Sequence, residues 1–325
     1  MKAVVLDTPG EQPGVRFDDR PNPTAPDGHV VVRVRAAGFS HHDALIMAGV
    51  LRRGVRLPLV LGHEIAGVVE ATGGGVAASW SGRDVVVLPG ALGHTEDGGF
   101  AERVVVPESS LVTVPAGLPA EHAALLASPI GVALKAVTDV GRARAGHTVV
   151  VTGVSGGLGV HAAQVAHAIG ARVIGVTGSD EKIAELEEMD WLDAVVAPGE
   201  VPWAELVRAL TDDAGADVVV DTVGGEMLDL AVRSLARHGR LVLLGQVSPE
   251  PGRLTSAEVV FREATIAGSL GAGRDHVERA LAMVQAGRVT PLVDRVLPLA
   301  AESVLEAYRL LRERAVVGRV VLRPA

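Results

Sequence analysis

Two patterns of hydrophobic residues divide the chain. Up to about residue 120, short runs of β-branched residues alternate with turns that contain Gly or Pro, which predicts an antiparallel, barrel-like β unit. From about His147 to Leu270, apolar strands alternate with helical stretches, which is typical of a doubly wound parallel sheet. The clearest predicted strands of the first region cover 30–34, 66–70, 84–88 and 101–106.

The second region contains six predicted strands, and their near-continuous Val content indicates burial on both faces. They cover 148–151, 172–176, 193–196, 217–220, 240–244 and 265–268. A helix from Leu158 to Ile169 follows the first of them and ends at Gly170, a typical C-terminal stop.

The last part of the chain is predicted to rejoin the first unit. Helices near 276–286 and 302–314 and a strand over 317–322 complete the sequence. We therefore predict an α/β fold with two domains: a β-barrel domain made of 1–122 and 271–325, and a doubly wound parallel sheet in 123–270.

Composition narrows the possible functions. The chain has 325 residues, 48% of them hydrophobic and 21% charged, which suits two folded domains. Its net charge of -9 has the wrong sign for a nucleic-acid backbone. There is no cysteine, so disulfides, cysteine nucleophiles and thiolate zinc ligands are excluded. No apolar run approaches the ~20 residues of a membrane span and no signal peptide is evident, so we expect a cytoplasmic protein without membrane or nucleic-acid partners.

A glycine-rich loop joins the strand over 148–152 to the following helix. Glycine is needed at such a loop for a tight turn, for close approach of the backbone to a pyrophosphate and for helix–strand packing, and the helix N-terminus favours the phosphate charge. The alternative is a glycine-rich turn without a ligand. The candidate dinucleotide-binding residues are Gly153, Ser155, Gly156, Gly157, Leu158 and Gly159.

The second strand of the αβ alternation indicates which nicotinamide cofactor binds. NAD sites usually place Asp or Glu at its end, but Thr177 occupies that position. Thr177, Ser179 and Lys182 could instead hold a 2′-phosphate, which favours NADP(H) over NAD(H). Two alternatives stay open: Asp180 as the ribose acid, or Ser179 or Asp180 as a helix N-cap. Because ligands lie at strand carboxyl ends, further candidates follow later strands: Thr222, Val223, Gly245, Gln246, Ser269 and Leu270.

The sequence resembles the medium-chain dehydrogenase/reductase superfamily, which includes zinc alcohol dehydrogenases and zinc-free quinone oxidoreductases. The resemblance covers essentially the whole chain. It implies a GroES-like catalytic domain, an inserted Rossmann domain, hydride transfer with a nicotinamide cofactor, and a homodimer or homotetramer. Besides the glycine loop, the motifs that carry it are Ala37–Asp43, Leu61–Glu64, Gly98–Glu102, Asp221–Gly225 and Gly318–Leu322.

The zinc ligands of this family are only partly present. Zinc alcohol dehydrogenases carry cysteines at the positions matching Ser40 and Ser128 and a histidine at the position matching His63. Neutral hydroxyls are poor zinc ligands beside thiolates, and the four-cysteine structural zinc lobe is missing. We therefore expect no catalytic zinc; if zinc binds, its ligands are His63 and Glu64, joined by His42, Asp43 or His41.

Hydride transfer places negative charge on a substrate oxygen, which needs an aimed donor or a Lewis acid. The resemblance places His42 at the position of the family's proton-relay hydroxyl, where an imidazole can donate near neutral pH. His41 matches a basic residue that contacts the cofactor pyrophosphate, and the alternative for both is a solvated loop. Glu64 and His63 could also be a structural hydrogen-bonded pair. The candidate catalytic residues are Ser40, His41, His42, Asp43, His63 and Glu64.

We predict an NADPH-dependent oxidoreductase that reduces an activated C=C or C=O of a small molecule, such as an enone, quinone, aldehyde or ketone, without zinc. One alternative is a zinc-dependent alcohol dehydrogenase; another is a non-catalytic NADPH-binding sensor or structural protein. Residues 47–58 and 252–261 are expected to line the substrate pocket. The remaining candidates are expected to be structural: His94, His122, His147, His161, His167, His238 and His276.

Overall fold

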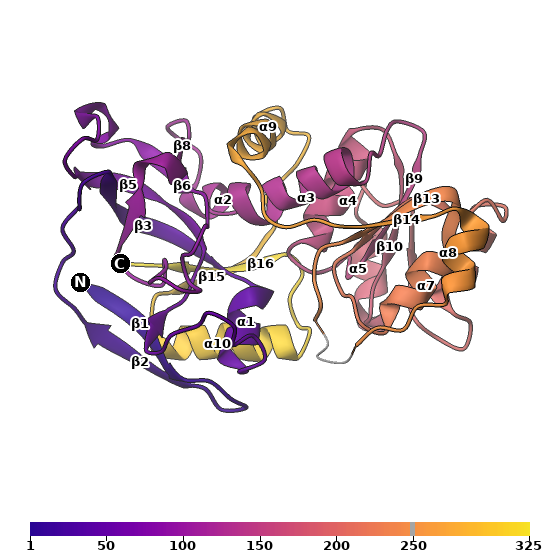
Figure 1. The fold of residues 1–325 in the computed structure, drawn as a ribbon, viewed down its shortest axis with the longest axis horizontal. Helices are drawn as coiled ribbons and strands as arrows, with labels where there is room; N and C mark the ends of the chain where they lie inside the picture. The colour runs from indigo at the N-terminus through magenta and orange to yellow at the C-terminus, as the bar shows by residue number, and fades with distance from the viewer. Residues whose placement is uncertain (248–250) are drawn as a thin grey trace. The chain divides into compact units, whose positions relative to one another are not determined.

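The computed structural model describes residues 1–247 and 251–325, and the chain forms two compact units (Figure 1). Unit 1 comprises Met1–Ser128, Ala272–Leu281 and Pro291–Ala325; unit 2 comprises Pro129–Gly271 and Ala282–Thr290. The first boundary thus falls after residue 128 rather than 122, and residues 272–290 are divided between the two units.

Unit 1 is built mainly from antiparallel strands, with β15 and β16 paired in parallel. A seven-stranded sheet has the order β15-β16-β3-β5-β6-β8, with β7 on β3, and a smaller sheet has the order β2-β1-β4. The strands are β1 (Lys2–Thr8), β2 (Gly14–Asp19), β3 (His29–Phe39), β4 (Leu59–Val60), β5 (Glu64–Thr72), β6 (Asp84–Val87), β7 (Arg103–Pro107), β8 (Leu111–Thr113), β15 (Val293–Pro298) and β16 (Arg319–Arg323). Strand β16 pairs with β3, with Val320 opposite Phe39, so the tail returns to the first unit as predicted.

Two features of unit 1 differ from the expectations. The clearest predicted strands left out β1 and β2, although β1 buries Ala3 to Leu6 almost completely. A solvated loop was one alternative for His41 and His42, but these two residues begin a helix, α1 (His41–Met47). The other helices that lie wholly or partly in unit 1 are α2 (Ala120–Ala123), α9 (Arg274–Gln285) and α10 (Ala301–Arg312).

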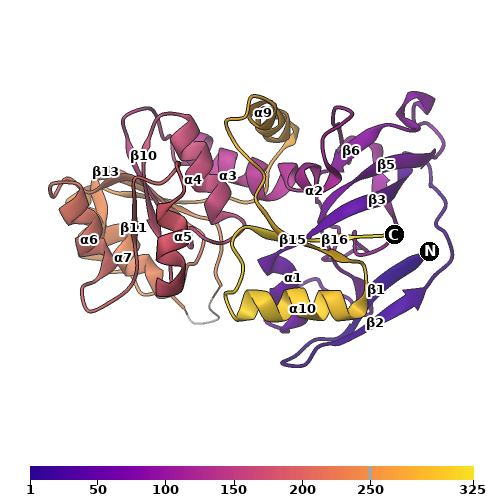
Figure 2. The ribbon, with the colours of Figure 1, turned by 180° about the vertical axis from the view of Figure 1, so that it is seen from behind.

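Unit 2 contains a six-stranded parallel sheet in the order β11-β10-β9-β12-β13-β14 (Figure 2). Val149, Val150 and Val151 of β9 are all fully buried, so the sheet is covered on both faces, as the Val-rich pattern predicts. The strands are β9 (Thr148–Thr152), β10 (Arg172–Val176), β11 (Ala194–Val196), β12 (Ala216–Asp221), β13 (Leu235–Leu243) and β14 (Thr265–Gly268).

The helices of unit 2 pack on this sheet. Trp203 and Val207 of α6 form a core with Val150, Ile174 and Val219. The helices are α3 (Val132–Leu134), α4 (Gly159–Ala168), α5 (Ile183–Glu187), α6 (Trp203–Leu210), α7 (Met227–Arg233) and α8 (Ser256–Arg262). Short 3-10 or π segments in the two units are η1 (Ala78–Trp80), η2 (Glu108–Ser110), η3 (Leu126–Gly131), η4 (Lys135–Val140) and η5 (Asp180–Lys182).

One segment, Ala120–Val140, is long and apolar enough to cross a membrane by length and composition alone. Two observations indicate that it is instead a buried segment of the protein core. Its most apolar window is 67% buried inside the structure, as a core helix would be. Ser128 within it has an extended backbone (φ -141°, ψ 126°) and is followed by Pro129, which separates two helical stretches.

Candidate functional site

The glycine loop of unit 2 has the close packing that the sequence predicts. Gly153 has φ +60°, and a Cβ there would lie 2.6 Å from Thr222 Oγ1. A Cβ on Gly159 would lie 2.2 Å from Gly153 O. Larger residues are therefore excluded at both positions. Within the part of the chain that the structure describes, the amides of Ser155, Gly157 and Leu158 donate no hydrogen bond, so they are available to an anion at the start of α4.

The other cofactor candidates gather at one edge of this sheet. Thr222 and Val223 follow β12, Gly245 and Gln246 lie shortly after β13, and Ser269 and Leu270 follow β14. Because all six strands are parallel, their carboxyl ends share an edge with the glycine loop. The Thr222 hydroxyl donates to Thr152 O at 2.8 Å, which links two strand ends. The buried Ser269 Oγ lacks a hydrogen-bond partner in the described residues.

Asp221, at the end of β12, holds the turn that follows this strand. Its Oδ1 accepts from the amides of Val223 (3.0 Å) and Gly224 (3.1 Å) and from the Thr152 hydroxyl (2.5 Å). A buried carboxylate that receives three donors is well satisfied. Asp221 therefore shapes the turn that carries Thr222 and Val223.

The 2′-phosphate candidates follow β10. Thr177 is buried, and its Oγ1 accepts from the Ser179 amide at 3.3 Å, so this threonine shapes the turn. The alternative of a helix N-cap is met only in part: Ser179 occupies the N-cap position of η5 but makes no side-chain cap bond, and Lys182 takes the N-cap position of α5. Ser179 and Lys182 lie on the segment directly after the strand, where a ribose substituent would approach in such a fold.

In unit 1, a capping box positions the paired histidines. Ser40 is the N-cap of α1: its Oγ accepts from the Asp43 amide at 3.2 Å, and its own amide donates to Asp43 Oδ2 at 2.8 Å. The sequence Ser40-His41-His42-Asp43 before an apolar run is the known signal for such a helix start, so α1 could have been predicted. The box fixes both histidines in the first turn, each half-buried.

Three imidazoles lie together beside this helix start. The His42 ring lies edge-on to the His63 ring with centroids 5.0 Å apart, and 5.2 Å from the His94 ring. His94, which is expected from the sequence to be structural, lies beside His42 in this cluster. Among the described residues, the buried Nδ1 atoms of His42, His63 and His94 have no hydrogen-bond partner.

Asp43 lies beside this cluster and connects it to the start of α1. It is fully buried, and its carboxylate accepts from Ser40 Oγ at 2.6 Å and from the Gly62 amide at 3.0 Å. Its Oδ1 lies 4.0 Å from His63 Nδ1. Asp43 therefore ties the start of α1 to the segment that carries His63.

Glu64 belongs to a different group of side chains. It is fully buried and pairs with Arg319 Nη2 of β16 at 2.9 Å, and it accepts from Ser128 Oγ at 3.3 Å. The alternative of a hydrogen-bonded His63–Glu64 pair is therefore wrong. Arg319 was missed by sequence reasoning, although an arginine inside a buried valine strand signals a buried acidic partner.

Burial governs the titration of these groups. It lowers the pKa of His42, with the Asp43 charge opposing the shift. It lowers the pKa of His63 to about 4, again against Asp43. Burial raises the pKa of Glu64 to about 7, although Arg319 favours its charged form. The His42 and His63 rings are thus neutral at pH 7. In this form an imidazole can bind a metal through one nitrogen or donate a hydrogen bond from the other.

The donor set can be compared with what zinc requires. Ser40 and Ser128 offer neutral hydroxyls that already donate to Asp43 and Glu64. The side-chain ligand atoms of His42, Asp43 and His63, by contrast, lie within 4.8 Å of one another. The family's cysteine positions therefore do not fit the metal, whereas the neutral imidazoles do.

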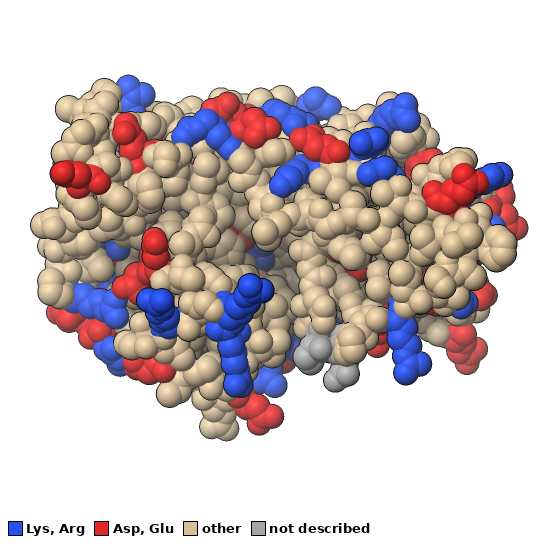
Figure 3. Space-filling model, viewed as in Figure 1, with Lys and Arg blue, Asp and Glu red and all other residues tan. Residues whose placement is uncertain are grey.

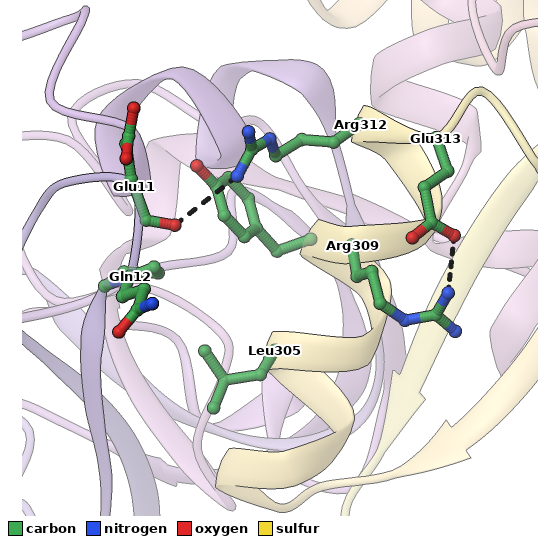
Figure 4. A pocket seen from close by; sticks show the side chains of 8 residues that line it. Glu11, Gln12, Leu305, Arg309, Arg312 and Glu313 are labelled. Carbon is green, nitrogen blue, oxygen red and sulfur yellow. Dashed lines mark hydrogen bonds and ion pairs between the residues drawn. The ribbon is translucent and has the colours of Figure 1, made fainter.

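A pocket of about 590 Å³ lies elsewhere on unit 1 (Figure 4). Three of its charged side chains are engaged: Arg309 pairs with Glu313, and Arg312 donates to Glu11 O at 3.4 Å and stacks over the Tyr308 ring. None of the candidate site residues lines it. On the face shown in Figure 3, acidic and basic side chains are interspersed.

Comparison with known proteins identifies the family to which the chain belongs. Residues 26–116 match the model of the alcohol dehydrogenase GroES-like domain, and residues 157–286 match that of the zinc-binding dehydrogenase. An acryloyl-coenzyme A reductase of Sulfurisphaera tokodaii is 32% identical, with 100% of both chains covered. An acryloyl-coenzyme A reductase of Metallosphaera sedula is 33% identical, with 99% of both covered. A crystal structure of an NAD-dependent alcohol dehydrogenase has a TM-score of 0.89 at 34% identity, covering 99% of both chains.

The chain therefore belongs to the medium-chain dehydrogenase/reductase superfamily, as its motifs indicate. It is an oxidoreductase with a GroES-like domain and a parallel-sheet nucleotide-binding domain, and it uses a nicotinamide cofactor and a small-molecule substrate.

Proposed function

We propose that this protein uses NADPH to reduce the C=C bond of a small α,β-unsaturated carbonyl compound, with an acyl thioester as the preferred class. The observation that carries the proposal is the position of the half-buried His42 at the start of α1. Burial lowers its pKa, which favours the neutral ring. Two relatives that match nearly the whole chain and are named acryloyl-coenzyme A reductases support the choice of C=C over C=O.

The proposed reaction is balanced by one hydride and one proton. NADPH bound at the glycine loop would supply a hydride that bonds to the β-carbon of the substrate; the C=C electron pair then forms a double bond between the α-carbon and the carbonyl carbon, and the C=O pair moves onto the oxygen. His42 donates a hydrogen bond to this enolate oxygen, which stabilises the developing charge. A proton from water then adds to the α-carbon, which gives the saturated thioester and leaves NADP⁺. Asp43 keeps the helix that carries His42 in place.

NADPH is the proposed donor because the residue at the end of β10 is Thr177 and the nearby cation is Lys182. The glycine loop supplies amides for the pyrophosphate. We also propose that the reaction is zinc-independent, since hydroxyls replace both cysteine ligands of the family's zinc site. If a divalent ion binds, the imidazoles of His42 and His63 would hold it, and it would supply a Lewis acid for the substrate oxygen.

The test is a substrate comparison with purified protein and either NADPH or NADH. We expect rapid NADPH oxidation with crotonyl-coenzyme A or acryloyl-coenzyme A, and slower oxidation with simple enones and quinones. Faster turnover of aldehydes, or of alcohols with NADP⁺, would overturn the proposed substrate class.

An alcohol dehydrogenase activity is the second candidate. The solved NAD-dependent alcohol dehydrogenase structure at 34% identity favours it. Alcohol oxidation that requires added zinc would select this candidate. NADPH binding without turnover of any thioester, enone, quinone, aldehyde or alcohol would instead select a non-catalytic sensor.

Assembly and location complete the proposal. We propose a homodimer or homotetramer in the cytoplasm, as the family resemblance implies for the assembly. Light scattering coupled to size-exclusion chromatography tests the first part, since a mass of 33.5 kDa would indicate a monomer. Fractionation of cells tests the second part, and recovery with membranes would contradict it.

A further inference from the structure

We infer that the loop after α1, residues 50–58, binds the phosphate groups of a coenzyme A thioester through Arg52, Arg53 and Arg56. We call this segment the arginine loop. The inference rests on the proposed function, because it assigns residues to the phosphorylated end of the proposed substrate. Arginine suits this ligand, since its planar guanidinium group can donate two parallel hydrogen bonds to one phosphate.

The first argument is the charge of the arginine loop. From residue 44 to residue 63 the sequence contains three arginines and neither Asp nor Glu, although the whole chain has a net charge of -9. All three arginines are exposed, and none forms an ion pair among the residues that the structure describes. By contrast, Arg16 and Arg103 of the same unit pair with Asp7 and Glu70. The positive charge of the loop is therefore not neutralised by its own neighbours along the chain.

The acidic residues of the adjoining segments do not neutralise it either. Asp97 follows β6 and pairs with Arg20 at 2.7 Å. Glu11, in the turn between β1 and β2, and Glu96 form no ion pair with the arginine loop in the described part of the chain. An anionic ligand would therefore meet three cations without displacing a carboxylate.

The second argument is the position of the arginine loop beside His42. The loop begins three residues after the end of α1, the helix that carries His42 in its first turn. A Cβ on Gly54 would lie 3.3 Å from His94 Nε2, and the His94 ring lies 5.2 Å from the His42 ring. The middle of the arginine loop therefore packs against the histidine cluster, and the arginines flank this contact.

The third argument is the distance between His42 and the arginines. Arg52 is fixed by a hydrogen bond from its Nε to Gly49 O, and its Nη2 would lie 3.3 Å from a Cβ on Gly49. Gly49 follows His42 by seven residues, which corresponds to about 10 Å along a helix.

This distance matches the length of the substrate. The pantetheine arm between the thioester and the diphosphate of coenzyme A has about as many bonds as a four-residue peptide, so it reaches at most about 14 Å. A substrate whose carbonyl oxygen accepts a hydrogen bond from His42 can therefore extend its diphosphate to the arginine loop.

The test compares crotonyl-coenzyme A with crotonyl-pantetheine, which has the same reacting bond and no phosphate. The Arg53→Gln/Arg56→Gln double variant is expected to raise KM for crotonyl-coenzyme A about tenfold. Its kcat with this substrate, and both constants with crotonyl-pantetheine, should stay within about twofold, because the lost contacts hold only the phosphates. Arg33→Gln, at an exposed position of β3, is the matched control and should behave like the unmodified protein. An equal rise of KM for both thioesters would overturn the inference.

A direct titration separates this inference from the proposed reaction. Calorimetry with coenzyme A, which needs no turnover, is expected to show affinity about tenfold weaker for the double variant than for the unmodified protein. Arg53→Lys/Arg56→Lys keeps both charges and should recover most of this affinity. A protein that binds coenzyme A in this way but reduces no thioester would refute the proposed function and leave the phosphate site in place.

NADPH is the second source of the same phosphate chemistry, so its affinity is measured in the same variants. We expect it to be unchanged, because the cofactor phosphates are assigned to the glycine loop of unit 2. Circular dichroism checks that each variant is folded. Equal affinity for coenzyme A in the unmodified protein and the folded double variant would overturn the inference. So would an equal loss of affinity for NADPH and for coenzyme A.

Discussion

The glycine loop of unit 2 and the histidine cluster of unit 1 differ in how they are encoded. The loop is one continuous segment, 153–159, and its partners follow parallel strands that end at the same sheet edge. The cluster draws on a helix start, on the residue before β5 and on a loop about 30 residues later. A local motif fixes the first site, whereas tertiary packing assembles the second. The nucleotide-binding residues can therefore be predicted from the sequence more securely than the catalytic residues.

The largest expected effect comes from the cluster. His42→Gln is expected to lower kcat with an unsaturated thioester by about 10²–10⁴-fold, the usual contribution of a positioned acid or base, with little change in NADPH affinity. Steady-state kinetics and a separate NADPH titration measure the two quantities. His29→Gln, on β3 in the same unit, is the control. Full turnover in His42→Gln would remove this histidine from the mechanism.

The same contrast explains what the sequence could predict. The αβ alternation of unit 2 has one strand or helix per hydrophobic run, so five of its six strands agree with the prediction to within one residue at each end, whereas β13 begins five residues before its predicted start. In unit 1, the capping box of α1 was present in the sequence but was overlooked. His94 carried no local signal at all, because its position depends on Gly93 and Gly98 packing on Gly62. Arg319 likewise acquires its partner, Glu64, only when β16 returns to β3.

A change in the glycine loop should affect binding rather than chemistry. Gly159→Ala places a Cβ 2.2 Å from Gly153 O, so the loop must move away from the cofactor phosphates. We expect NADPH affinity to fall about 100-fold, equivalent to about 2.7 kcal/mol, in a calorimetric titration. Gly199→Ala is the control, since nothing lies within 4 Å of its Cβ. Equal affinities in the two variants would contradict the assigned phosphate site.

A smaller effect tests the cofactor preference. Lys182→Ala is expected to weaken NADPH binding about tenfold, or about 1.4 kcal/mol, and to leave NADH binding unchanged, because only NADPH carries the 2′-phosphate. Parallel titrations with both cofactors measure the difference. The same loss for both would show that Lys182 does not distinguish them. Arg172→Ala, which removes an exposed cation at the opposite end of β10, serves as the control.

The smallest expected effect is that of metal removal on turnover. Because the proposed oxygen donor is an imidazole, chelator-treated protein should retain its NADPH-dependent reductase rate within about twofold. Metal content is measured alongside the rate. Loss of turnover that zinc restores would overturn the zinc-independent reaction.

The central claim is hydride transfer from a bound nicotinamide to an activated C=C bond. The direct measurement uses NADPH carrying deuterium at C4, on either face, with crotonyl-coenzyme A, and analyses the product by mass spectrometry and NMR. The account predicts one NADPH oxidised per saturated thioester and deuterium on its β-carbon with one of the two labelled faces. A product without deuterium from either face, or NADPH that binds and is never oxidised, would contradict it.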